Sequence, residues 1–142
     1  MIVNISAENN KCIPYKKHDS DAGFDLRSAM EFFDIYPGET KQIHTGIRIA
    51  IPKGYMGMIV PRSGLGSRGF ALKNTIGIID SEYRGEIIII GTNNGMSPIP
   101  INKFDRIAQL ILVPVLLPVI NVVDKLDDTE RGEGGFGHTG HN

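Results

Sequence analysis

The chain has 142 residues, with 15 Lys and Arg residues against 16 Asp and Glu residues and a formal net charge of −1. A chain of this length forms one domain with a substantial hydrophobic core. A charge near zero and the lack of a long Lys/Arg run exclude a nucleic-acid binder that works by neutralising phosphates, so we expect a small or locally recognised partner.

The N-terminal segment, Met1 to Tyr15, has short apolar intervals and runs into Pro14, which predicts an edge strand. It lacks the basic and long apolar stretches of a signal peptide. Its Cys12 is the only cysteine of the chain, so no internal disulfide can form. Both observations favour an intracellular, cytoplasmic protein.

Alternating residues predict a second strand from Phe24 to Ser28. Asp25 lies between Phe24 and Leu26 in this strand, so its side chain should point to the opposite face, as an ordinary solvent-facing side chain does. Taken alone, Asp25 is therefore interpreted as structural.

Turn and strand signals then alternate. Pro37 and Gly38 predict a type II turn. The segment Ile43 to Ile51 predicts one strand with its isoleucines on one face. Pro52 to Tyr55 predicts a further turn, which is followed by a strand from Met56 to Val60.

The segment from Pro61 to Gly69 is rich in arginine, serine and glycine, which suits either an anion site or an exposed turn. Leu65 interrupts the polar run where a short helix could begin, and the first amides of a helix would add to an anion site. The segment lacks the Gly-Lys-Ser/Thr ending of a P-loop. Phosphate binding and a plain turn are equal alternatives for these residues alone.

The most informative segment runs from Ile76 to Ile90. One apolar run stops at Asp80, the chain turns through Ser81 to Gly85, and a second apolar run follows, which predicts a hairpin. A plain polar turn is the simpler alternative. Against it, Asp80 follows two isoleucines, and a carboxylate held beside apolar side chains can have a raised pKa and act as a base. Tyr83 offers a flat ring that could pack on a sugar.

Asn93 to Gly95 predicts another hairpin turn. Ile99 and Ile101 alternate with prolines, as in an edge strand. The segment Phe104 to Val113 is nearly all apolar, as in a strand buried on both faces. Its Gln109 needs a partner, because burying an unpaired amide costs about 1–3 kcal/mol. That partner is either another site residue or a neighbouring strand.

The apolar stretch Leu110 to Ile120 contains two prolines and is too short to span a bilayer, so we expect a soluble protein with no membrane contact. An apolar arm from Val119 to Val123 would be exposed on a compact monomer, which favours packing against a neighbouring subunit.

Residues 129–142 are rich in glycine and cannot build a core. We therefore expect a β-domain over residues 1–128 and a mobile C-terminal lid over residues 129–142. The lid carries Arg131 as a cation, Phe136 as an aromatic ring, and Thr139, among glycines that act as flexible hinges. This combination suits closure over a nucleotide. Its two histidines, His138 and His141, lack the further ligands that a metal site needs.

Helix-period patterns are nearly absent, and no repeat or domain break interrupts the chain. The sequence therefore predicts an all-β fold, a sandwich or jelly roll.

Five segments resemble, in order and spacing, the five motifs of the trimeric dUTP diphosphatases (dUTPases): Ala22–Leu26, Pro61–Leu65, Gly77–Gly85, Arg106–Gln109 and Arg131–Gly140. One such motif would be weak evidence, whereas five in sequence are specific. The resemblance implies a jelly-roll homotrimer with three active sites at subunit boundaries, where the C-terminal tail of one chain closes over a site built by the others. It also implies Mg²⁺-dependent hydrolysis of dUTP to dUMP and diphosphate, which limits dUTP and supplies dUMP for dTMP synthesis.

The resemblance further implies a role for each matching residue. Asp80 would deprotonate the water that attacks the α-phosphorus, and Gln109 would help to position that water. Asp25 would hold the magnesium ion through water, while the phosphates supply most of its ligands. The implied substrate contacts are Arg62, Ser63, Gly64, Arg131, Gly137, His138 and Thr139 for the phosphates, Tyr83 for the deoxyribose, and Asn74, Gly77, Ile78, Ile79, Ile88 and Phe136 for the uracil base.

Two alternatives stay open. A dCTP deaminase shares the fold and several motifs of this family but acts on the base, and a non-catalytic trimeric module could sense nucleotides or dock a partner. The Asp-x-x-Tyr turn and the tail that carries Phe136 favour dUTP hydrolysis over a deaminase, and the intact motifs favour a catalyst over a binding module.

Overall fold

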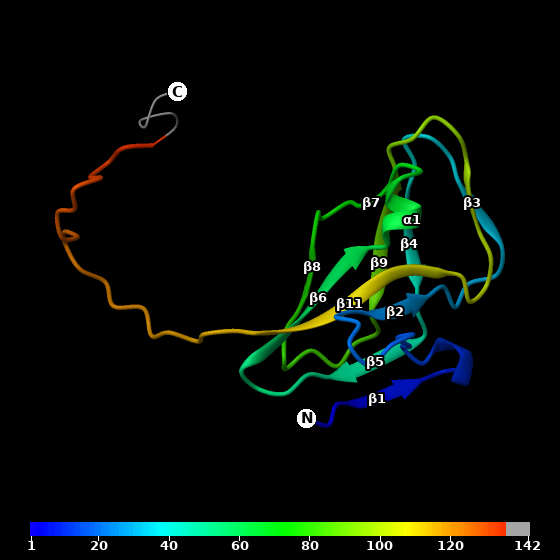
Figure 1. Ribbon diagram of the computed structural model, residues 1–142, viewed down its shortest axis with the longest axis horizontal. Helices are drawn as coiled ribbons and strands as arrows, with labels where there is room; N and C mark the ends of the chain where they lie inside the picture. The colour runs from blue at the N-terminus through cyan, green and yellow to red at the C-terminus, as the bar shows by residue number, and fades with distance from the viewer. Residues whose placement is uncertain (136–142) are drawn as a thin grey trace.

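The computed structural model describes residues 1–135 of the chain. This part is built almost entirely from short strands, which confirms the all-β prediction (Figure 1). The elements are β1 (Asn4–Ala7), η1 (a 3₁₀ helix, Asn10–Cys12), β2 (Phe24–Arg27), β3 (Phe33–Ile35), β4 (Thr40–His44), β5 (Ile47–Ala50), β6 (Tyr55–Pro61), α1 (Ser63–Gly66), β7 (Phe70–Leu72), β8 (Gly77–Ile79), β9 (Ile88–Asn93), β10 (Ile99–Ile101) and β11 (Arg106–Pro114).

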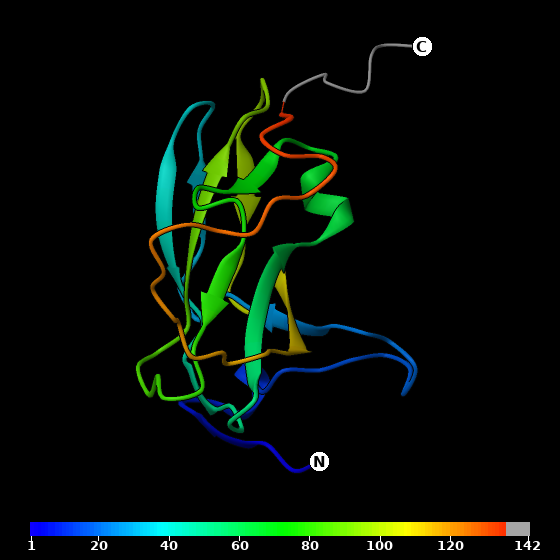
Figure 2. The same cartoon turned by 90° about the vertical axis from the view of Figure 1, so that its left-hand side faces the viewer.

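The strands form antiparallel sheets in which sequence neighbours seldom pair. The largest sheet has the order β2-β11-β6-β8, and a second has the order β4-β9-β7. Two further pairs, β1-β5 and β10-β3, complete the described part (Figures 1 and 2). The long strand β11 is hydrogen-bonded to β2 on one side and to β6 on the other, so it forms the middle of the largest sheet.

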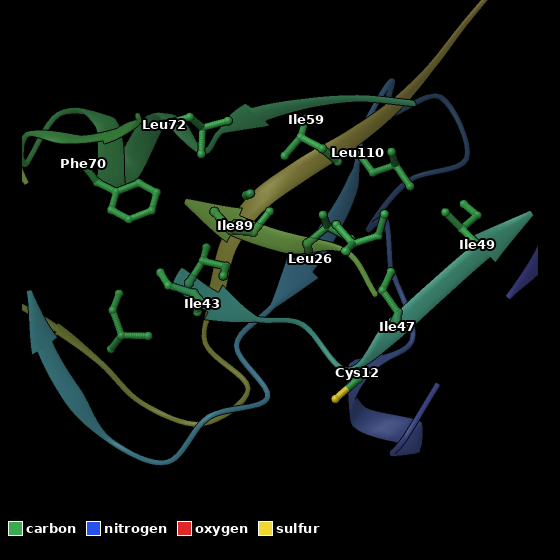
Figure 3. Packing of buried hydrophobic residues seen from close by; sticks show 14 of the residues in the cluster. Cys12, Leu26, Ile43, Ile47, Ile49, Ile59, Phe70, Leu72, Ile89 and Leu110 are labelled. Atoms are coloured by element: carbon green, nitrogen blue, oxygen red, sulfur yellow. The ribbon is translucent and has the colours of Figure 1, made fainter. Parts of the chain in front are cut away.

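The core lies between the two larger sheets. Ile59 and Leu110 of the four-stranded sheet gather with Ile43 and Ile89 of the three-stranded sheet in one cluster (Figure 3). These four side chains are at most 2% exposed. Each buried side chain of this size contributes about 1.5–3 kcal/mol. The cluster therefore holds the two sheets together as a sandwich.

Several local predictions are confirmed. The edge strand near the N-terminus is β1, which pairs only with β5 among the described strands. At the predicted type II turn, Glu39 donates its amide to the Tyr36 carbonyl and Gly38 has a φ of 79°. The turn before β6 closes through Gly54, whose φ is 86°. Glycine suits both positions because positive φ values cost it little.

The prediction of one strand from Ile43 to Ile51 is wrong. The segment forms β4 and β5, which belong to different sheets and meet at Gly46, where φ is 67°. The buried Thr45 hydroxyl donates to the Ile87 carbonyl at 2.5 Å and helps to fix this corner. The isoleucines are nevertheless all buried, because both strands face the same core.

Both predicted hairpins are also wrong. β8 pairs with β6 while β9 pairs with β4 and β7, so the Ser81–Gly85 turn connects two sheets rather than two partners. The turn after Asn93 leads to β10, which pairs with β3 instead of β9. The buried Asn93 side chain holds that turn by donating to the Ile35 and Ser97 carbonyls.

After β11 the chain leaves the body as an extended arm, residues 115–135 (Figure 1). Its apolar side chains are exposed, with Leu116 and Val119 both 94% and Val122 90% accessible. This confirms the predicted exposed apolar arm. Among the described residues, no helix is long and apolar enough to cross a membrane.

Candidate functional site

Several of the residues singled out from the sequence line two separate hollows. One is lined by Ile78, Ile79, Asp80, Tyr83, Glu86 and Ile88 and is called the turn pocket here. The other is lined mainly by the loop 16–23 and by Asp25, Arg62, Arg106 and Gln109 and is called the arginine pocket. The turn pocket lies where β8 and β9 flank the Ser81–Gly85 turn, and the arginine pocket lies over β2 and β11.

Tyr83 is held firmly in the turn pocket. Its hydroxyl donates to the Glu86 carbonyl at 2.9 Å. Its ring lies over Gly85, where an added Cβ would come within 2.3 Å of the Tyr83 hydroxyl oxygen. Only glycine leaves room for the ring at this position. Tyr83 is 43% exposed, so part of the residue is accessible to a ligand.

Asp80 lies at the mouth of the same pocket, and its carbonyl accepts the Tyr83 amide at 3.1 Å. Ile78 and Ile79 lie beside it as predicted, but the Asp80 side chain is exposed. The sequence predicted that apolar side chains would enclose the Asp80 carboxylate, and within one chain they do not. An exposed carboxylate is free to meet a water molecule and a substrate.

The bend before β8, residues 74–77, leads the chain into the strand that lines the turn pocket. Thr75 has a φ of 64°, which is an outlier for a β-branched residue, and the Ile76 amide donates to the Asn74 carbonyl across it at 2.6 Å. Gly77 is buried against Ile59, where an added Cβ would meet the Ile59 side chain at 3.0 Å. Asn74 and Ile78 are exposed, and Ile78 lines the pocket together with Ile88.

Asp25 is the centre of the arginine pocket, and the prediction of a solvent-facing side chain is wrong. Asp25 is 7% exposed, with Oδ2 3.2 Å from Arg106 Nη1 and Oδ1 2.7 Å from Arg62 Nε. The Arg62 Nε–H does not point at Asp25 Oδ1, so this contact is an ion pair and not a hydrogen bond. The arginines follow Asp25 by many residues in the chain, so strand periodicity could not reveal them.

Arg106 is a functional candidate to which the sequence prediction gave no role. It belongs to the Arg-Ile-Ala-Gln segment that was matched as a motif, and this match was the available signal. Its guanidinium remains 44% exposed while it bonds Asp25, so it can contact an anion as well.

Gln109 is half-buried on β11, opposite Asp25 on one side and Val60 on the other. It packs on Gly23, where an added Cβ would lie 3.2 Å from the Gln109 Cβ. The partner predicted for its amide is not found among residues 1–135, and the side chain lines the arginine pocket instead. Its amide is therefore available to a ligand.

The predicted short helix is α1, with Arg62 at its N-cap. Ser63 and Gly64 in its first turn are exposed, and amides in a first turn have no partner within the helix. The loop after α1 is fixed by backbone packing, since a Cβ on Gly69 would meet the Gly95 nitrogen at 2.3 Å. The Asn94 amide donates to the Gly69 carbonyl at 2.8 Å.

The structure does not bring Asp80 and Gln109 together in one chain. Gln109 lies opposite Val60, while Asp80 follows Ile79, which lies opposite Gly57. Asp80 is thus displaced by about 13 Å along the strands and about 10 Å across them, or about 16 Å in total. Side chains stand roughly perpendicular to a sheet and do not shorten such a gap. A water molecule could not contact both residues of one chain.

The described residues contain no group of three or more His, Cys, Asp and Glu side chains that could hold a metal ion. Asp25 is one carboxylate whose oxygens already face two arginines. These residues fit a magnesium ion only if the ion arrives with a ligand that supplies most of its oxygens and contacts Asp25 through water.

Arg131 lies in the arm, and its Nε donates to the Gly134 carbonyl at 3.0 Å. It lies in a small turn in which the Gly132 amide donates to the Thr129 hydroxyl at 3.1 Å. The predicted lid residues Phe136, Gly137, His138 and Thr139 lie outside the described residues.

Comparisons with known proteins point to one family. The family model described as dUTPase matches residues 9–140. A protein of Haemophilus influenzae (strain PittEE) named deoxyuridine 5'-triphosphate nucleotidohydrolase is 47% identical over 131 residues, which cover 90% of this chain and 87% of that protein. A protein of Burkholderia cenocepacia (strain HI2424) with the same name is 40% identical over 139 residues, covering 96% and 94%.

The solved structures agree. A variant dUTPase of Staphylococcus bacteriophage 80alpha with dUpNHpp matches with a TM-score of 0.87 at 28% identity, over 98% of both chains. A variant dUTPase of phage phi11 of S. aureus, described as revealing the coordination of a structural Mg(II) ion, matches with a TM-score of 0.80 at 26% identity, over 88% of this chain and 98% of that chain.

Proposed function

This chain belongs to the dUTPase family, and from that premise we propose that it hydrolyses dUTP to dUMP and diphosphate. The observation that carries the proposal is the exposed Asp80 carboxylate at the mouth of a pocket walled by isoleucines and by the Tyr83 ring. Such a pocket suits an apolar base and a sugar, and it leaves the carboxylate next to the phosphate that follows the sugar. The reaction limits dUTP and supplies dUMP for dTMP synthesis.

Asp80 accepts the proton of the water that attacks the α-phosphorus. In phosphoryl transfer the protein mostly orients the reactants and neutralises charge, so one base and several phosphate donors suffice. Gln109 orients the same water through its amide, which has no partner among the described residues. The two residues cannot do this within one chain, because about 16 Å separates their backbones.

This separation supports a site shared between chains, and the active form is the homotrimer that the family resemblance implies, with three sites at its subunit boundaries. In each site the turn pocket of one chain faces the arginine pocket of a second chain. The exposed apolar arm after β11 supports this arrangement, because side chains such as Leu116 and Val119 gain burial only against another chain. The β-domain comprises residues 1–128, and the tail comprises residues 129–142.

The phosphates bind at the arginine pocket. Arg62 lies at its edge, and the exposed first turn of α1 presents the amides and the hydroxyl of Ser63 and Gly64. Asp25 would hold magnesium through water, while it keeps Arg62 and Arg106 in place. When bound, the ion neutralises negative charge on the phosphates.

The uracil base and the sugar bind in the turn pocket. Backbone groups around Ile78, Ile79 and Ile88 recognise the base. Gly77 and Asn74 also contribute to binding of the base. Tyr83 lies under the deoxyribose and leaves no room for a 2′-hydroxyl. Its hydrogen bond to the Glu86 carbonyl holds the ring in the required position.

The tail of a third chain closes the site. Phe136 covers the base, while Arg131, Gly137, His138 and Thr139 reach the phosphates. Closure expels bulk water and leaves the attacking water in place. A free, buried Cys12 thiol and a deoxynucleotide substrate both suit a cytoplasmic enzyme.

The test is to incubate the protein with each of the four dNTPs, dUTP and UTP, with Mg²⁺ or with excess EDTA. We expect diphosphate from dUTP with Mg²⁺ and little from the others. Ammonia from dCTP would instead identify a deaminase. Tight binding of dUTP without any product would identify a nucleotide-sensing module. Light scattering of the same sample checks the trimer.

A further inference from the structure

Glu86 is a half-buried carboxylate in the wall of the turn pocket that the proposed mechanism does not use. Its Oε2 lies 2.8 Å from His44 Nδ1, and its Oε1 accepts the Gly46 amide at 2.8 Å. The side chain is only 15% exposed. Both oxygens are thus committed to the corner between β4 and β5.

The next residue strengthens the same attachment. The Ile87 amide donates to the Ile47 carbonyl at 2.9 Å, and the Ile87 carbonyl accepts the Thr45 hydroxyl at 2.5 Å. Residues 86 and 87 therefore make four hydrogen-bonding contacts to residues 44–47. Residues 86 and 87, directly before β9, are thus attached to the corner at Gly46. These four contacts are called the clamp here.

The clamp ends at Tyr83. The carbonyl that receives the Tyr83 hydroxyl belongs to Glu86, and the ring packs on Gly85, which directly precedes it. Displacement of Glu86 would therefore move both contacts that orient the ring. The rest of the turn, Ser81 to Arg84, is held by bonds within itself, such as Arg84 Nη1 to the Ser81 carbonyl at 2.6 Å.

Charge keeps the clamp closed at neutral pH. Burial opposes ionisation of Glu86, but the His44 hydrogen bond, the Gly46 amide and the charge of Arg48 outweigh it, so the pKa of Glu86 lies below its ordinary value. Arg48 in turn lies 3.9 Å from Glu8, and Asp80 is the other carboxylate of the pocket. Glu86 is thus an anion over the whole neutral range.

We propose that Glu86 is a positioning residue for Tyr83 and, through that ring, sets the preference for deoxyribose over ribose. This inference rests on the proposed function, because it takes Tyr83 as the residue that senses the sugar. A steric filter works only while its wall stays in place, and a ring free to tilt would admit a 2′-hydroxyl.

The test compares kcat and KM for dUTP and UTP in Glu86→Ala, Glu86→Gln and Tyr83→Ala. Glu86→Ala should lower the selectivity ratio about tenfold, mainly by raising kcat/KM for UTP. Glu86→Gln should keep much of the ratio, because its amide oxygen can still accept the Gly46 amide. Tyr83→Ala should lower the ratio at least as far as Glu86→Ala.

Glu39→Ala is the matched control. Glu39 also holds a turn through one backbone amide and one basic side chain, since it accepts the Tyr36 amide at 2.8 Å and pairs with Lys41 at 2.6 Å. It is not among the residues that line the turn pocket. Its variant should keep the wild-type ratio even if its melting temperature falls.

Hydrogen exchange of the free protein gives a readout that needs no activity. The Tyr83 and Ile87 amides should exchange faster in Glu86→Ala than in the wild type and should not change in Glu39→Ala. If Glu86→Ala does not fold, Glu86→Gln is scored in the same way, with a smaller expected change.

The outcomes separate the two proposals. If the wild-type protein hydrolyses no dUTP, the proposed function is wrong. The exchange rates of the Tyr83 and Ile87 amides still test the clamp in that case. A ratio that falls in Tyr83→Ala but not in Glu86→Ala overturns the role of Glu86 alone. Unchanged exchange at Tyr83 and Ile87 in every Glu86 variant overturns it as well.

Discussion

The turn pocket and the arginine pocket are held in different ways. In the turn pocket the side chains of Asp80 and Tyr83, to which we assign roles, are exposed, and backbone contacts with Gly85 and Glu86 hold the ring. In the arginine pocket the central carboxylate is buried and two guanidinium groups hold it. The turn pocket therefore leaves the Asp80 carboxylate free to react. The arginine pocket uses the Asp25 carboxylate to hold two arginine side chains in place.

This difference indicates a division of labour. A carboxylate with both oxygens facing arginines is occupied and serves as an anchor, as Asp25 does. A carboxylate at an open turn can exchange protons with a bound water, as we propose for Asp80. The two pockets lie too far apart in one chain to share a phosphate, and we propose that each is half of a site that a second chain completes.

The largest expected effect comes from removing the free acid. Asp80→Asn should lower kcat for dUTP about 10³-fold, because it removes the base, while the Kd for dUpNHpp changes little. Steady-state kinetics and calorimetry measure the two quantities. Asp25→Asn, at the anchor, should instead weaken binding of the analogue together with turnover. Equal loss of binding in both variants would remove the distinction between base and anchor.

Mixing inactive chains tests whether the two pockets meet across a boundary. Asp80→Asn and Gln109→Ala chains should each be nearly inactive alone. Unfolded together and refolded as mixed trimers, they should regain about a quarter of the wild-type turnover, because one site in four then takes both intact residues from different chains. No recovery in trimers shown to be mixed would mean that each site draws both residues from one chain.

Gly85→Ala disturbs the turn pocket without removing a polar side chain. The new Cβ would lie within 2.3 Å of the Tyr83 hydroxyl oxygen, so the ring must swing away. We expect the dUTP over UTP ratio of kcat/KM to fall about tenfold. The melting temperature should change little, because the ring is at the surface. A ratio equal to that of the wild type would show that the position of the ring does not control sugar choice.

Gly23→Ala is the equivalent change in the arginine pocket and should act more weakly. Its Cβ would lie 3.2 Å from the Gln109 Cβ, a contact that a shift of a few tenths of an ångström relieves. We expect kcat for dUTP to fall a few-fold, about 2–5-fold, with the sugar preference unchanged. A change in the sugar preference of this variant would link the two pockets in a way that the structure does not indicate.

The comparison also shows what the sequence could predict. Glycine and proline signals identified the turns at Gly38 and Gly54, because such turns depend on local φ values. The apolar residues of the core were recognised from another local signal, because burial follows strand periodicity. Asp80 and Asp25 were found by the matched motifs. These features lie within short segments of the chain.

Features that depend on distant segments were missed. The burial of Asp25 depends on Arg106, 81 residues away, which no local pattern can reveal. The apolar runs on either side of Asp80 look like a hairpin, yet each pairs with a strand from another part of the chain. Local rules predict that a strand exists and do not determine its partner.

Acid should produce the smallest effect, through the Glu86 clamp. The folded-state pKa of Glu86 is lowered from 4.5, so ionised Glu86 stabilises the fold above the unfolded-state value. That contribution is lost as pH falls through the lowered value. The difference in melting temperature between the wild type and Glu86→Gln should therefore be full above about pH 6 and shrink towards about pH 3.

Calorimetry of both proteins across this range measures that difference. A gap that stays constant down to about pH 3 would mean that the charge of Glu86 contributes nothing to the fold. In that case neutral hydrogen bonding alone would hold the corner. The exchange rate of the Ile87 amide, followed over the same range, distinguishes a loosened clamp from general unfolding, because only the clamp should open while the bonds of β11 to β2 and β6 stay closed.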